Sequence, residues 1–483
     1  MTAGRFVATV DVGSSSVRAM LWDFQGREAR GLEVQHQYAA GTEIDPDRLA
    51  RQVLRCLVEL IRLAGPRRAQ AIAAVGVSTF WHGLVAADES KHALTPVYLW
   101  SDVRSSSAAE RLRERLDADA VWRRTGCPLH ASYWPAKMAW LREEQPDLWR
   151  RPVRWLSFGD LLFWRLFGHL GTSLSMASGT GLLRLDDCRW DEELLTELHI
   201  ESGTLPPLAK AERGLAPTYA RVLPALADKP WVHAAGDGAL ANLGSGCTSR
   251  ADRAITIGTS AALRVMHGPS TASLPRGLWR YRLDESRLVT GGALSNGGNL
   301  RDWLLTNLRT GTRFPHAAPG EHGLTFLPHL FGERGLGYAA GAFGAVAGLT
   351  SASSADDIAQ AAYEAVAVQL AQIDGKLDEI LPGARRLVAS GAALLNSPAW
   401  MQMIADAAGR PIAASRVREA SSRGAALFAM EILGMARPSA TGSTTPKVFM
   451  PRRKNARAYR EIEARQAALY KVLIKDRILD HTR

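Results

Sequence analysis

Asp237 is the residue best placed for acid–base chemistry, because it lies between two glycines, Gly236 and Gly238. It follows the apolar residues 231–235 and precedes a helix-like segment at 239–244, so it stands where a strand gives way to a helix. Flanking glycines let a substrate approach the carboxylate closely, as a catalytic base requires. An aspartate at a helix N-terminus can equally serve as a helix cap, and the sequence leaves both interpretations open.

An internal repeat relates residues 10–20 to residues 255–266. Both segments have an apolar run, a Gly-Ser/Thr-Ser turn and a second run, and the turn residues are Gly13, Ser14 and Ser15, then Gly258, Thr259 and Ser260. The period exceeds that of solenoid repeats, so it predicts two related domains that each open with the same hairpin. Turn amides and hydroxyls bind anions, so two such hairpins facing a cleft would clamp phosphates. Each could also be an ordinary β-hairpin.

The two copies differ in one way that bears on chemistry, because Asp11 in the first copy corresponds to Thr256 in the second. A Mg²⁺ ion held mainly by water and phosphate oxygens needs only one or two protein carboxylates. Asp11 is therefore the candidate magnesium ligand.

Two polar and aromatic clusters, residues 81–83 and 100–104, follow strand-like runs. Ligands of α/β folds bind beyond the carboxyl ends of strands, and a sugar is suited by aromatic faces with carboxylate or imidazole groups. The candidate sugar-binding residues are Trp81, His82, Gly83 and Asp102. His82 could instead be a satisfied core histidine, and Asp102 could form a local ion pair with Arg104.

The sequence pattern predicts the strands and helices that would position these residues. Residues 6–10, 17–22 and 30–38 predict an antiparallel meander, followed by a helix from Asp45 and Pro46 onward and a buried strand at 71–78. In the second half, 356–381, 398–408 and 424–433 predict helices, and 386–389 predicts a strand. The fold class is α/β.

Composition restricts the classes of protein that this chain can be. Its 483 residues are 46% hydrophobic and 22% charged, which excludes a disordered, collagen-like or coiled-coil chain. Of the net charge of +11, most lies in residues 447–483, where 11 Lys and Arg stand against 4 Asp and Glu. Such a concentrated charge does not favour nucleic-acid binding. The tail from Arg452 predicts a surface helix that docks through Tyr459 and Ile462, with a membrane-surface role as the alternative.

The four cysteines lie far apart and form no CxxC pair, so neither a disulfide framework nor a structural zinc site is expected. No apolar run has the length of a membrane-spanning helix, and the N-terminus shows no signal-peptide pattern. We therefore expect a cytoplasmic protein, and the sequence leaves a homodimer open.

Taken together, these segments resemble the FGGY family of carbohydrate kinases over nearly the whole chain. The resemblance rests on residues 11–18, 81–83, 100–104, 236–238, 256–261, 331–334, 391–406, 419–420 and 424–426. It implies two actin-like ATPase (ribonuclease H-like) domains with an interdomain cleft. The implied parts are a sugar-binding domain at 1–248, an ATP-binding domain at 249–440 and a basic helical extension at 441–483.

The resemblance also implies roles for single residues. Asp237 would be the catalytic base and Asp11 would help to place Mg²⁺. The ATP phosphates would lie at Gly13, Ser14, Ser15 and Arg18, with Gly258, Thr259 and Ser260 opposite. Gly391, Asn396 and Gln402 would face the adenosine. Ala392 departs from the family pattern, which usually has a second glycine there, and its methyl group puts these adenosine contacts in doubt.

Different segments of the chain resemble family members with different substrates. His82-Gly83 resembles xylulokinases, whereas residues 100–104, 125–137 and 175–181 look more like gluconokinase-type members. We expect gluconate or a similar sugar acid, with a ketopentose such as xylulose as the alternative. Glycerol is not expected, because the Arg-Glu pair typical of glycerol kinases is absent around 81–83. Two other classes remain open, an actin-like ATPase without a sugar acceptor and a catalytically silent sugar sensor.

Overall fold

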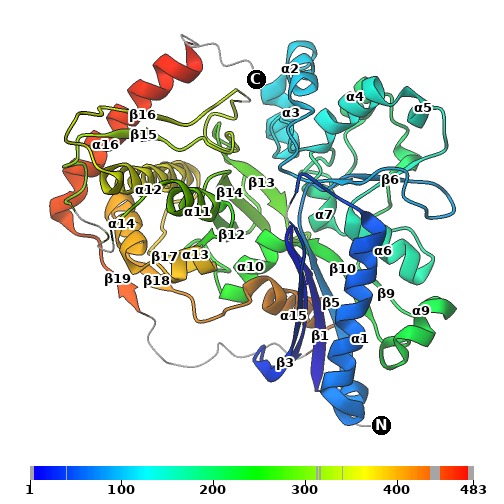
Figure 1. The fold of residues 1–483 in the computed structure, drawn as a ribbon. Helices are drawn as coiled ribbons and strands as arrows, with labels where there is room; N and C mark the ends of the chain where they lie inside the picture. The colour runs from blue at the N-terminus through cyan, green and yellow to red at the C-terminus, as the bar shows by residue number, and fades with distance from the viewer. Residues whose placement is uncertain are drawn as a thin grey trace. The chain divides into compact units, whose positions relative to one another are not determined.

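The computed structural model describes residues 5–39, 41–311, 314, 317–339, 341–435 and 447–476, and Figure 1 labels their helices and strands. The chain divides into two compact units. Unit 1 takes the described parts of 1–246, 280–289 and 419–443, and unit 2 takes those of 247–279, 290–418 and 444–483. The chain thus returns twice to unit 1, and the contiguous boundaries at 248 and 440 stay predictions.

Unit 1 is built on a six-stranded sheet of order β3-β2-β1-β5-β10-β9. The strands are β1 (Phe6–Val12), β2 (Ser16–Asp23), β3 (Glu28–Gln37), β5 (Ile72–Thr79), β9 (Ala211–Glu212) and β10 (Trp231–Gly236). The antiparallel meander of β1, β2 and β3 confirms the prediction. β5 pairs parallel with both β1 and β10, so the carboxyl ends of these three strands lie at one edge of the sheet.

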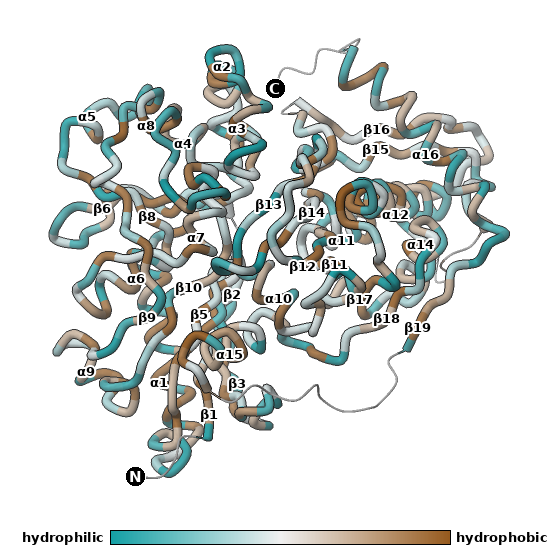
Figure 2. Tube along the Cα trace, turned by 180° about the vertical axis from the view of Figure 1, so that it is seen from behind, coloured by the Kyte–Doolittle hydropathy of each residue, from teal (hydrophilic) through white to brown (hydrophobic). Residues whose placement is uncertain are grey.

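Two helices cover the faces of this sheet. α1 (Pro46–Gln70) contacts β2 and β3, and α15 (Ala420–Ile432) contacts β1 and β5. Figures 1 and 2, drawn from opposite sides, show the two helices on opposite faces, with hydrophobic residues along β5 and α15. α1 begins as predicted, because the Asp45 carboxylate accepts hydrogen bonds from the backbone N–H groups of Asp47 and Arg48 at 2.8 and 3.1 Å.

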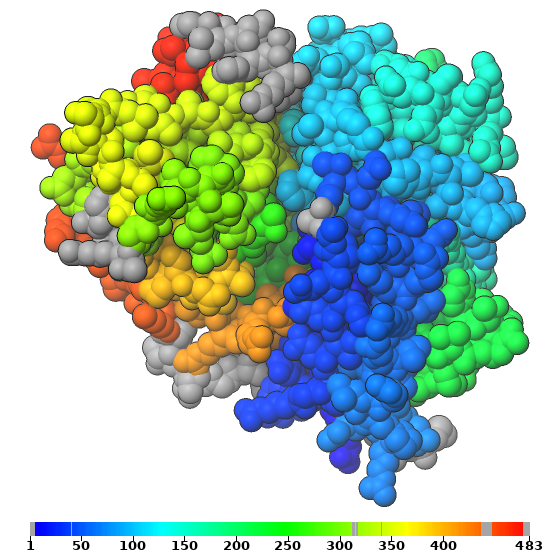
Figure 3. Space-filling view, viewed as in Figure 1, coloured from blue at the N-terminus to red at the C-terminus, as the bar shows by residue number. Residues whose placement is uncertain are grey.

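Shorter elements complete unit 1. Two small ladders pair β4 (Glu43–Ile44) with β7 (Val97–Tyr98) and β6 (Val85–Ala87) with β8 (Arg154–Leu156). The helices are α2 (Ser106–Arg115), α3 (Ala118–Thr125), α4 (Trp134–Glu144), α5 (Pro146–Trp149), α6 (Phe158–Phe167), α7 (Leu174–Ser178), α8 (Glu192–Leu198), α9 (Pro217–Val222) and α10 (Asp237–Ser245), with 3₁₀ turns at Ser202–Thr204 and Pro224–Leu226. Figure 3 shows the surface formed by the blue N-terminal residues of this unit.

The second large sheet has seven strands in the order β13-β14-β12-β11-β17-β18-β19, and β11, β12, β17, β18 and β19 belong to unit 2. Its strands are β11 (Asp252–Ile257), β12 (Ala261–His267), β13 (Trp279–Arg282), β14 (Leu288–Leu294), β17 (Arg386–Ser390), β18 (Ile412–Ala414) and β19 (Val448–Phe449). β11 and β12 form an antiparallel hairpin, and β17 runs parallel to β11. This repeats the arrangement of β1, β2 and β5, so the predicted repeat of a hairpin is confirmed.

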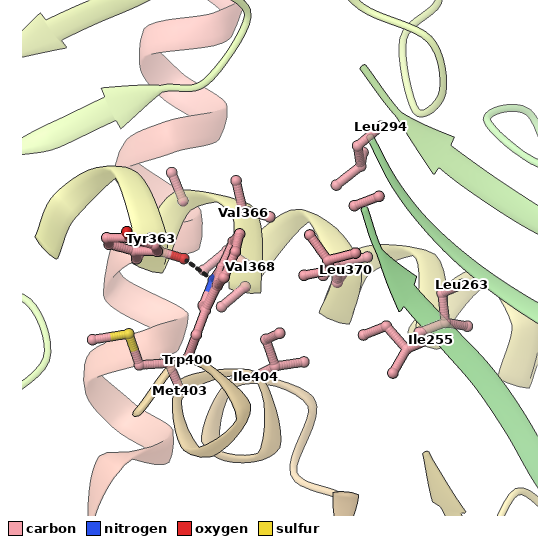
Figure 4. Packing of buried hydrophobic residues seen from close by; sticks show 14 of the residues in the cluster. Ile255, Leu263, Leu294, Tyr363, Val366, Val368, Leu370, Trp400, Met403 and Ile404 are labelled. Atoms are coloured by element: carbon pink, nitrogen blue, oxygen red, sulfur yellow. Dashed lines mark hydrogen bonds between the residues drawn. The ribbon is translucent and has the colours of Figure 1, made fainter. Parts of the chain in front are cut away.

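A hydrophobic core fills unit 2 beneath its longest helix, α12 (Ala355–Ile380). Figure 4 shows Trp400 of α14 (Pro398–Ala408) inside this core, where its indole N–H donates to the carbonyl oxygen of Tyr363 at 3.2 Å. Leu370 and Ile255 link the helix to the sheet in the same cluster. The remaining elements are α11 (Gly298–Asn307), α13 (Ala392–Leu395), β15 (Thr325–Leu327) and β16 (Ala345–Ala347).

The basic tail forms the predicted helix as far as the structure describes it. A 3₁₀ turn at Arg453–Asn455 leads into α16 (Ala456–Tyr470), which ends in a π-helical turn at Lys471–Lys475. Tyr459 and Ile462 are buried against unit 2, where α16 contacts α12 and α14. This confirms the docked helix. Residues 436–446 and 477–483 of the predicted extension lie outside the described residues.

Candidate functional site

Asp11 and Asp237 meet at the carboxyl edge of the unit 1 sheet. Asp11 lies near the end of β1 and pairs with Ser78 of β5, while Gly236, which ends β10, pairs with Thr79 of the same strand. Asp237 opens α10 directly after β10, and its carboxylate accepts a hydrogen bond from the N–H of Gly238 at 2.7 Å. The central strand therefore places the two carboxylates on either side of its own end.

Negative charge accumulates around Asp11. Burial raises the pKa of the Asp11 carboxyl to about 6, and the charges of Asp237 and Glu419 add to that rise. The Ser78 hydroxyl and the Arg18 guanidinium act in the opposite direction. A bound cation would relieve this repulsion, so the surroundings of Asp11 fit Mg²⁺. No group of three His, Cys, Asp or Glu side chains in the described part of the chain could hold a metal by itself, so an ion here needs further oxygen ligands.

Arg18 lies opposite Asp11 in the β1–β2 ladder. Its Nε lies 2.9 Å from the Glu33 carboxylate, and its Nη1 donates to Glu419, the residue that precedes α15. Two carboxylates thus hold the guanidinium beside Asp11. A phosphate contact by Arg18 would have to share or replace these ion pairs.

The turn between β1 and β2 carries Gly13, Ser14 and Ser15. The Gly13 N–H donates to the Ser16 carbonyl at 2.9 Å, which closes the turn. Tyr38, which directly follows β3, holds this turn in place. Its N–H donates to the Ser15 carbonyl at 2.9 Å, and its hydroxyl donates to the Gly13 carbonyl. Burial raises the pKa of Tyr38, so the hydroxyl stays protonated as a donor. Tyr38 was missed from the sequence, because nothing local links it to a turn 23 residues earlier.

Trp81 follows β5 at the same edge and is 6% exposed. A Cβ atom at Gly236 would stand 1.9 Å from its ring, and one at Gly179 would stand 2.5 Å from it. Its indole N–H donates to the Ser175 carbonyl at 3.0 Å. The two glycines therefore make room for an indole that packs directly against the strand leading to Asp237.

His82 lies in an aromatic cluster with Tyr133 and Tyr281. It is 3% exposed, has a positive φ of 67° and places Nδ1 2.6 Å from the Gly179 carbonyl. Its ring meets those of Tyr133 and Tyr281 edge to face at 4.8 and 5.4 Å between centroids, and the two tyrosine hydroxyls share a hydrogen bond of 2.6 Å. Both tyrosines were missed as site residues. Tyr281 belongs to unit 1 but lies 148 residues after Tyr133 in the chain, and no sequence pattern signals their contact.

Asp102 forms an ion pair with Arg104, which was the alternative to a sugar contact in the sequence analysis. Its carboxylate is buried and receives Nε and Nη2 of Arg104 at 3.0 and 2.6 Å. Lys137 links β7, the strand before this segment, to His82, because its ammonium donates to the carbonyl oxygens of His82 and Tyr98 at 2.8 and 3.1 Å. Gly83 is also confined, since a Cβ there would stand 2.6 Å from the Phe80 ring. Substrate contacts by Asp102 and Gly83 stay predictions.

In unit 2, the turn of Gly258, Thr259 and Ser260 joins β11 to β12. The Gly258 N–H donates to the Ser260 carbonyl at 3.0 Å, repeating the closure seen at Gly13. The first residue of α11, Gly298, donates its N–H to the Gly258 carbonyl at 2.8 Å, and Asn299 donates to the Thr259 carbonyl at 3.0 Å. The turn therefore rests on a helix N-terminus.

The three adenosine candidates lie around α13 and α14. Gly391 has a φ of 88° and leaves no room for a side chain, because a Cβ would stand 2.4 Å from the Ile257 carbonyl oxygen. Ala392, the departure from the family pattern, and Asn396 are exposed at the two ends of α13. Gln402 donates its amide to Asp406 and to the Met450 carbonyl, both at 2.8 Å, so an adenosine contact would have to use Oε1.

The chain matches the family models for FGGY carbohydrate kinases over both halves. Residues 6–244 match the N-terminal domain and residues 253–431 match the C-terminal domain of that family. The chain is 27% identical to a gluconokinase of Bacillus subtilis, covering 89% of this chain and 88% of that protein. It is 31% identical to a xylulose kinase of Streptomyces rubiginosus, covering 90% of each.

A solved structure supports the fold. The crystal structure of gluconate kinase from Lactobacillus acidophilus superposes with a TM-score of 0.85 at 24% identity, covering 97% of this chain and 98% of that chain. The architecture is the two-domain α/β fold of the actin-like ATPases, as predicted. All four cysteines have free thiols. Within the described ranges, no helix is both long and apolar enough to cross a membrane.

Proposed function

Because the chain belongs to the FGGY family of carbohydrate kinases, we propose that it transfers the γ-phosphoryl group of ATP to a hydroxyl group of a sugar acid of the gluconate type. The family makes it a phosphotransferase that acts on a sugar and takes ATP as the phosphate donor. The observation that carries the residue assignments is that Asp11 and Asp237 both lie at the carboxyl edge of the unit 1 sheet, one on each side of β5.

Asp237 is the proposed catalytic base. In the reaction, the acceptor oxygen forms a bond to the γ-phosphorus as the bond from that phosphorus to the bridging oxygen of ADP breaks. The acceptor proton passes to the Asp237 carboxylate. Asp237 is partly exposed at the first position of α10, where it is open to a substrate and still anchored by the Gly238 N–H. The helix N-terminus stabilises its anionic, proton-accepting form.

The phosphates are assigned to the turn residues of each unit. The proposed contacts are Gly13, Ser14, Ser15 and Arg18 in unit 1 and Gly258, Thr259 and Ser260 in unit 2. Mg²⁺, when bound at Asp11, neutralises phosphate charge during a transfer whose catalysis rests on positioning and electrostatics. Gly391 and Asn396 remain the proposed adenosine contacts, with Gln402 restricted to its carbonyl oxygen.

The sugar is assigned to the cluster of Trp81, His82 and Gly83, with Asp102 nearby. Gluconate is preferred because segments 100–104, 125–137 and 175–181 resemble gluconokinases, and because a gluconokinase is among the relatives that cover most of the chain. Xylulose or another ketopentose is the alternative, supported by His82-Gly83 and by the xylulose kinase relative. A cytoplasmic location and a homodimer stay predictions.

A coupled assay of ADP release tests this proposal. The purified chain is given Mg²⁺-ATP with gluconate, xylulose, ribulose, glycerol or other polyols, one at a time. We expect the highest kcat/KM with gluconate. A highest value with xylulose would select the alternative substrate. ATP turnover that is equal with and without every sugar would instead indicate an actin-like ATPase without a sugar acceptor.

A further inference from the structure

Unit 2 contains a cavity that none of the proposed kinase residues lines. Its volume is about 640 Å³, within the range of small-molecule sites. It lies between the C-terminal half of α12, the end of α14, α16 and the loop that follows β15. Figure 1 shows α12, α14 and α16 beside one another.

Two buried polar side chains on the cavity wall lack partners. His329 is 3% exposed, and its buried Nε2 has no hydrogen-bond partner. Gln369 is 5% exposed, and its amide makes no hydrogen bond to any residue that the structure describes. An unpaired polar group inside a protein costs about 1–3 kcal/mol. The buried Nε2 of His329 carries this cost, and the Gln369 amide on the same wall has no partner among the described residues, so both have hydrogen-bonding capacity left for a ligand.

Gly375 lies at the exposed rim of the cavity, inside α12. It lies inside α12 with ordinary helical backbone, and a Cβ added there would meet no atom within 4 Å. A glycine inside a helix costs about 1 kcal/mol relative to alanine. Neither backbone geometry nor packing requires this glycine. Its lack of a side chain leaves the rim of the cavity unobstructed.

The charged groups of the wall largely compensate one another. Asp374 receives Nη1 of Arg253 and Nε of Arg410, both at 2.5 Å, and Asp378 pairs with the same two arginines. Glu333 accepts hydrogen bonds from the Tyr470 hydroxyl and from two backbone N–H groups at 2.6–3.0 Å. The other charged residues on the wall are two of each sign, Glu379, Glu463, Lys376 and Lys475. This balance does not favour an ion of either sign.

We propose that the cavity is a second carbohydrate site, which binds a neutral, hydroxyl-rich molecule such as a sugar or polyol. Hydroxyl groups both donate and accept hydrogen bonds, as do the amide of Gln369 and a neutral imidazole at His329. The ring of Tyr470, which packs edge to face on His329, supplies an apolar surface for C–H groups. Leu327 and Leu336 extend that surface.

Equilibrium dialysis of the full chain with radiolabelled sorbitol and maltose tests the proposal. Gly375→Trp places a large ring at the rim of the cavity, where it should obstruct entry, and Gly375→Ala is the matched control that adds only a methyl group. We expect Gly375→Trp to bind one probe molecule fewer per chain than the wild type, or to bind it at least tenfold more weakly. Gly375→Ala should bind as the wild type does. This difference holds whether or not the Trp81 cluster also takes the probe.

Thermal melts establish that each variant is folded, and kcat with the best sugar substrate should stay unchanged in both. If Gly375→Trp fails to fold, Gln369→Met replaces it, since this change removes the amide at nearly constant volume and should weaken binding at least fivefold. Equal probe binding by the wild type and the cavity variants would overturn the proposal. So would a cavity-dependent preference for inorganic phosphate or spermidine over sorbitol.

Failure here would leave the proposed kinase activity intact, because Gly375 and Gln369 have no part in phosphoryl transfer. Conversely, a chain without kinase activity could still bind the probe in a Gly375-dependent manner. The two proposals therefore stand or fall on separate measurements.

Discussion

Gly236 lies directly against the indole ring of Trp81, so closely that a Cβ atom at position 236 would stand 1.9 Å from Cε2 of that ring. Ser175 joins both residues, because its hydroxyl accepts the Gly236 N–H at 3.1 Å and its carbonyl accepts the Trp81 indole at 3.0 Å. The side chain of Trp81, which is proposed to bind the sugar, and β10, the strand that leads to Asp237, are thus held in a fixed relative position. A shift of either displaces the other.

Gly236→Ala is expected to lower kcat/KM for the sugar about 100-fold, because the added methyl group forces the indole or the strand to move. Overpacking of this kind should also cost about 1–3 kcal/mol of unfolding free energy. Steady-state kinetics and urea denaturation measure the two effects. Gly203→Ala is the matched control, since a Cβ there meets no atom within 4 Å. Wild-type kinetics in Gly236→Ala would contradict the close coupling of the two residues.

Asp237→Asn is expected to lower kcat about 10²–10⁴-fold, because an amide cannot accept the hydroxyl proton. The KM for ATP should change less than about threefold, since the assigned phosphate contacts lie elsewhere. Initial rates over a matrix of ATP and sugar concentrations separate the two constants. Asp228→Asn removes an exposed carboxylate that precedes the N-terminal end of β10, opposite to the end that Asp237 follows, and should leave both constants unchanged. Substantial sugar phosphorylation by Asp237→Asn would remove this residue from the mechanism.

Tyr38→Phe should raise the KM for ATP several-fold with a smaller effect on kcat, because it deletes the hydroxyl that holds the Gly13 carbonyl in the proposed phosphate turn. The lost hydrogen bond should cost about 0.5–1.5 kcal/mol of unfolding free energy. Kinetics at fixed sugar and varied ATP give the first value, and urea denaturation gives the second. Tyr219→Phe is the control, as no hydrogen bond of its hydroxyl is found within the described residues. An unchanged KM would show that the turn does not depend on Tyr38.

The stability of the protein should fall in acid partly through His329. Burial lowers the pKa of this imidazole from its usual 6.5 to about 4. The imidazole therefore becomes protonated near pH 6.5 in the unfolded chain but only near pH 4 in the folded chain. Since protonation favours the unfolded state between these values, the free energy of unfolding decreases as the pH falls through this window. From pH 7 to pH 5, the loss from this group is about 2 kcal/mol.

Urea denaturation at pH 7 and pH 5 measures this effect. His329→Phe should lose about 2 kcal/mol less than the wild type between the two pH values, whatever its stability at pH 7. His199→Asn, which replaces an exposed histidine with a residue that tolerates its positive φ of 54°, should keep the wild-type difference. An identical pH dependence in all three proteins would show that His329 titrates normally in the folded state.

The elements with strong local signals were predictable. The helix after Asp45 and the long helix near 356–381 followed from caps and apolar spacing, and the structure has them at Pro46–Gln70 and Ala355–Ile380. The hairpins at Gly13 and Gly258 followed from their repeated small-residue turns. Each of these depends on residues that are neighbours in sequence, so the pattern contains the interaction that forms the structure.

Long-range packing was beyond such reasoning. Glu419 reaches Arg18 from 401 residues away, and Tyr281 reaches Tyr133 from 148 residues away. No local pattern around Glu419 or Tyr281 predicts these contacts. The ion pair of Asp102 with Arg104 is a local interaction, and it was the interpretation that the motif by itself favoured over a substrate contact.

By itself, the sequence determined which chemical groups are available and on which local elements they stand: a glycine-flanked carboxylate, a second carboxylate before a small-residue turn, and an aromatic-imidazole pair after a strand. Tertiary structure decided which of them share one place, because the parallel pairing of β1, β5 and β10 brings the ends of three distant strands to one edge. It also decided their electrostatic state. Desolvation and neighbouring charge, which raise the pKa of Asp11, depend on what surrounds a group in space and not on what flanks it in the chain.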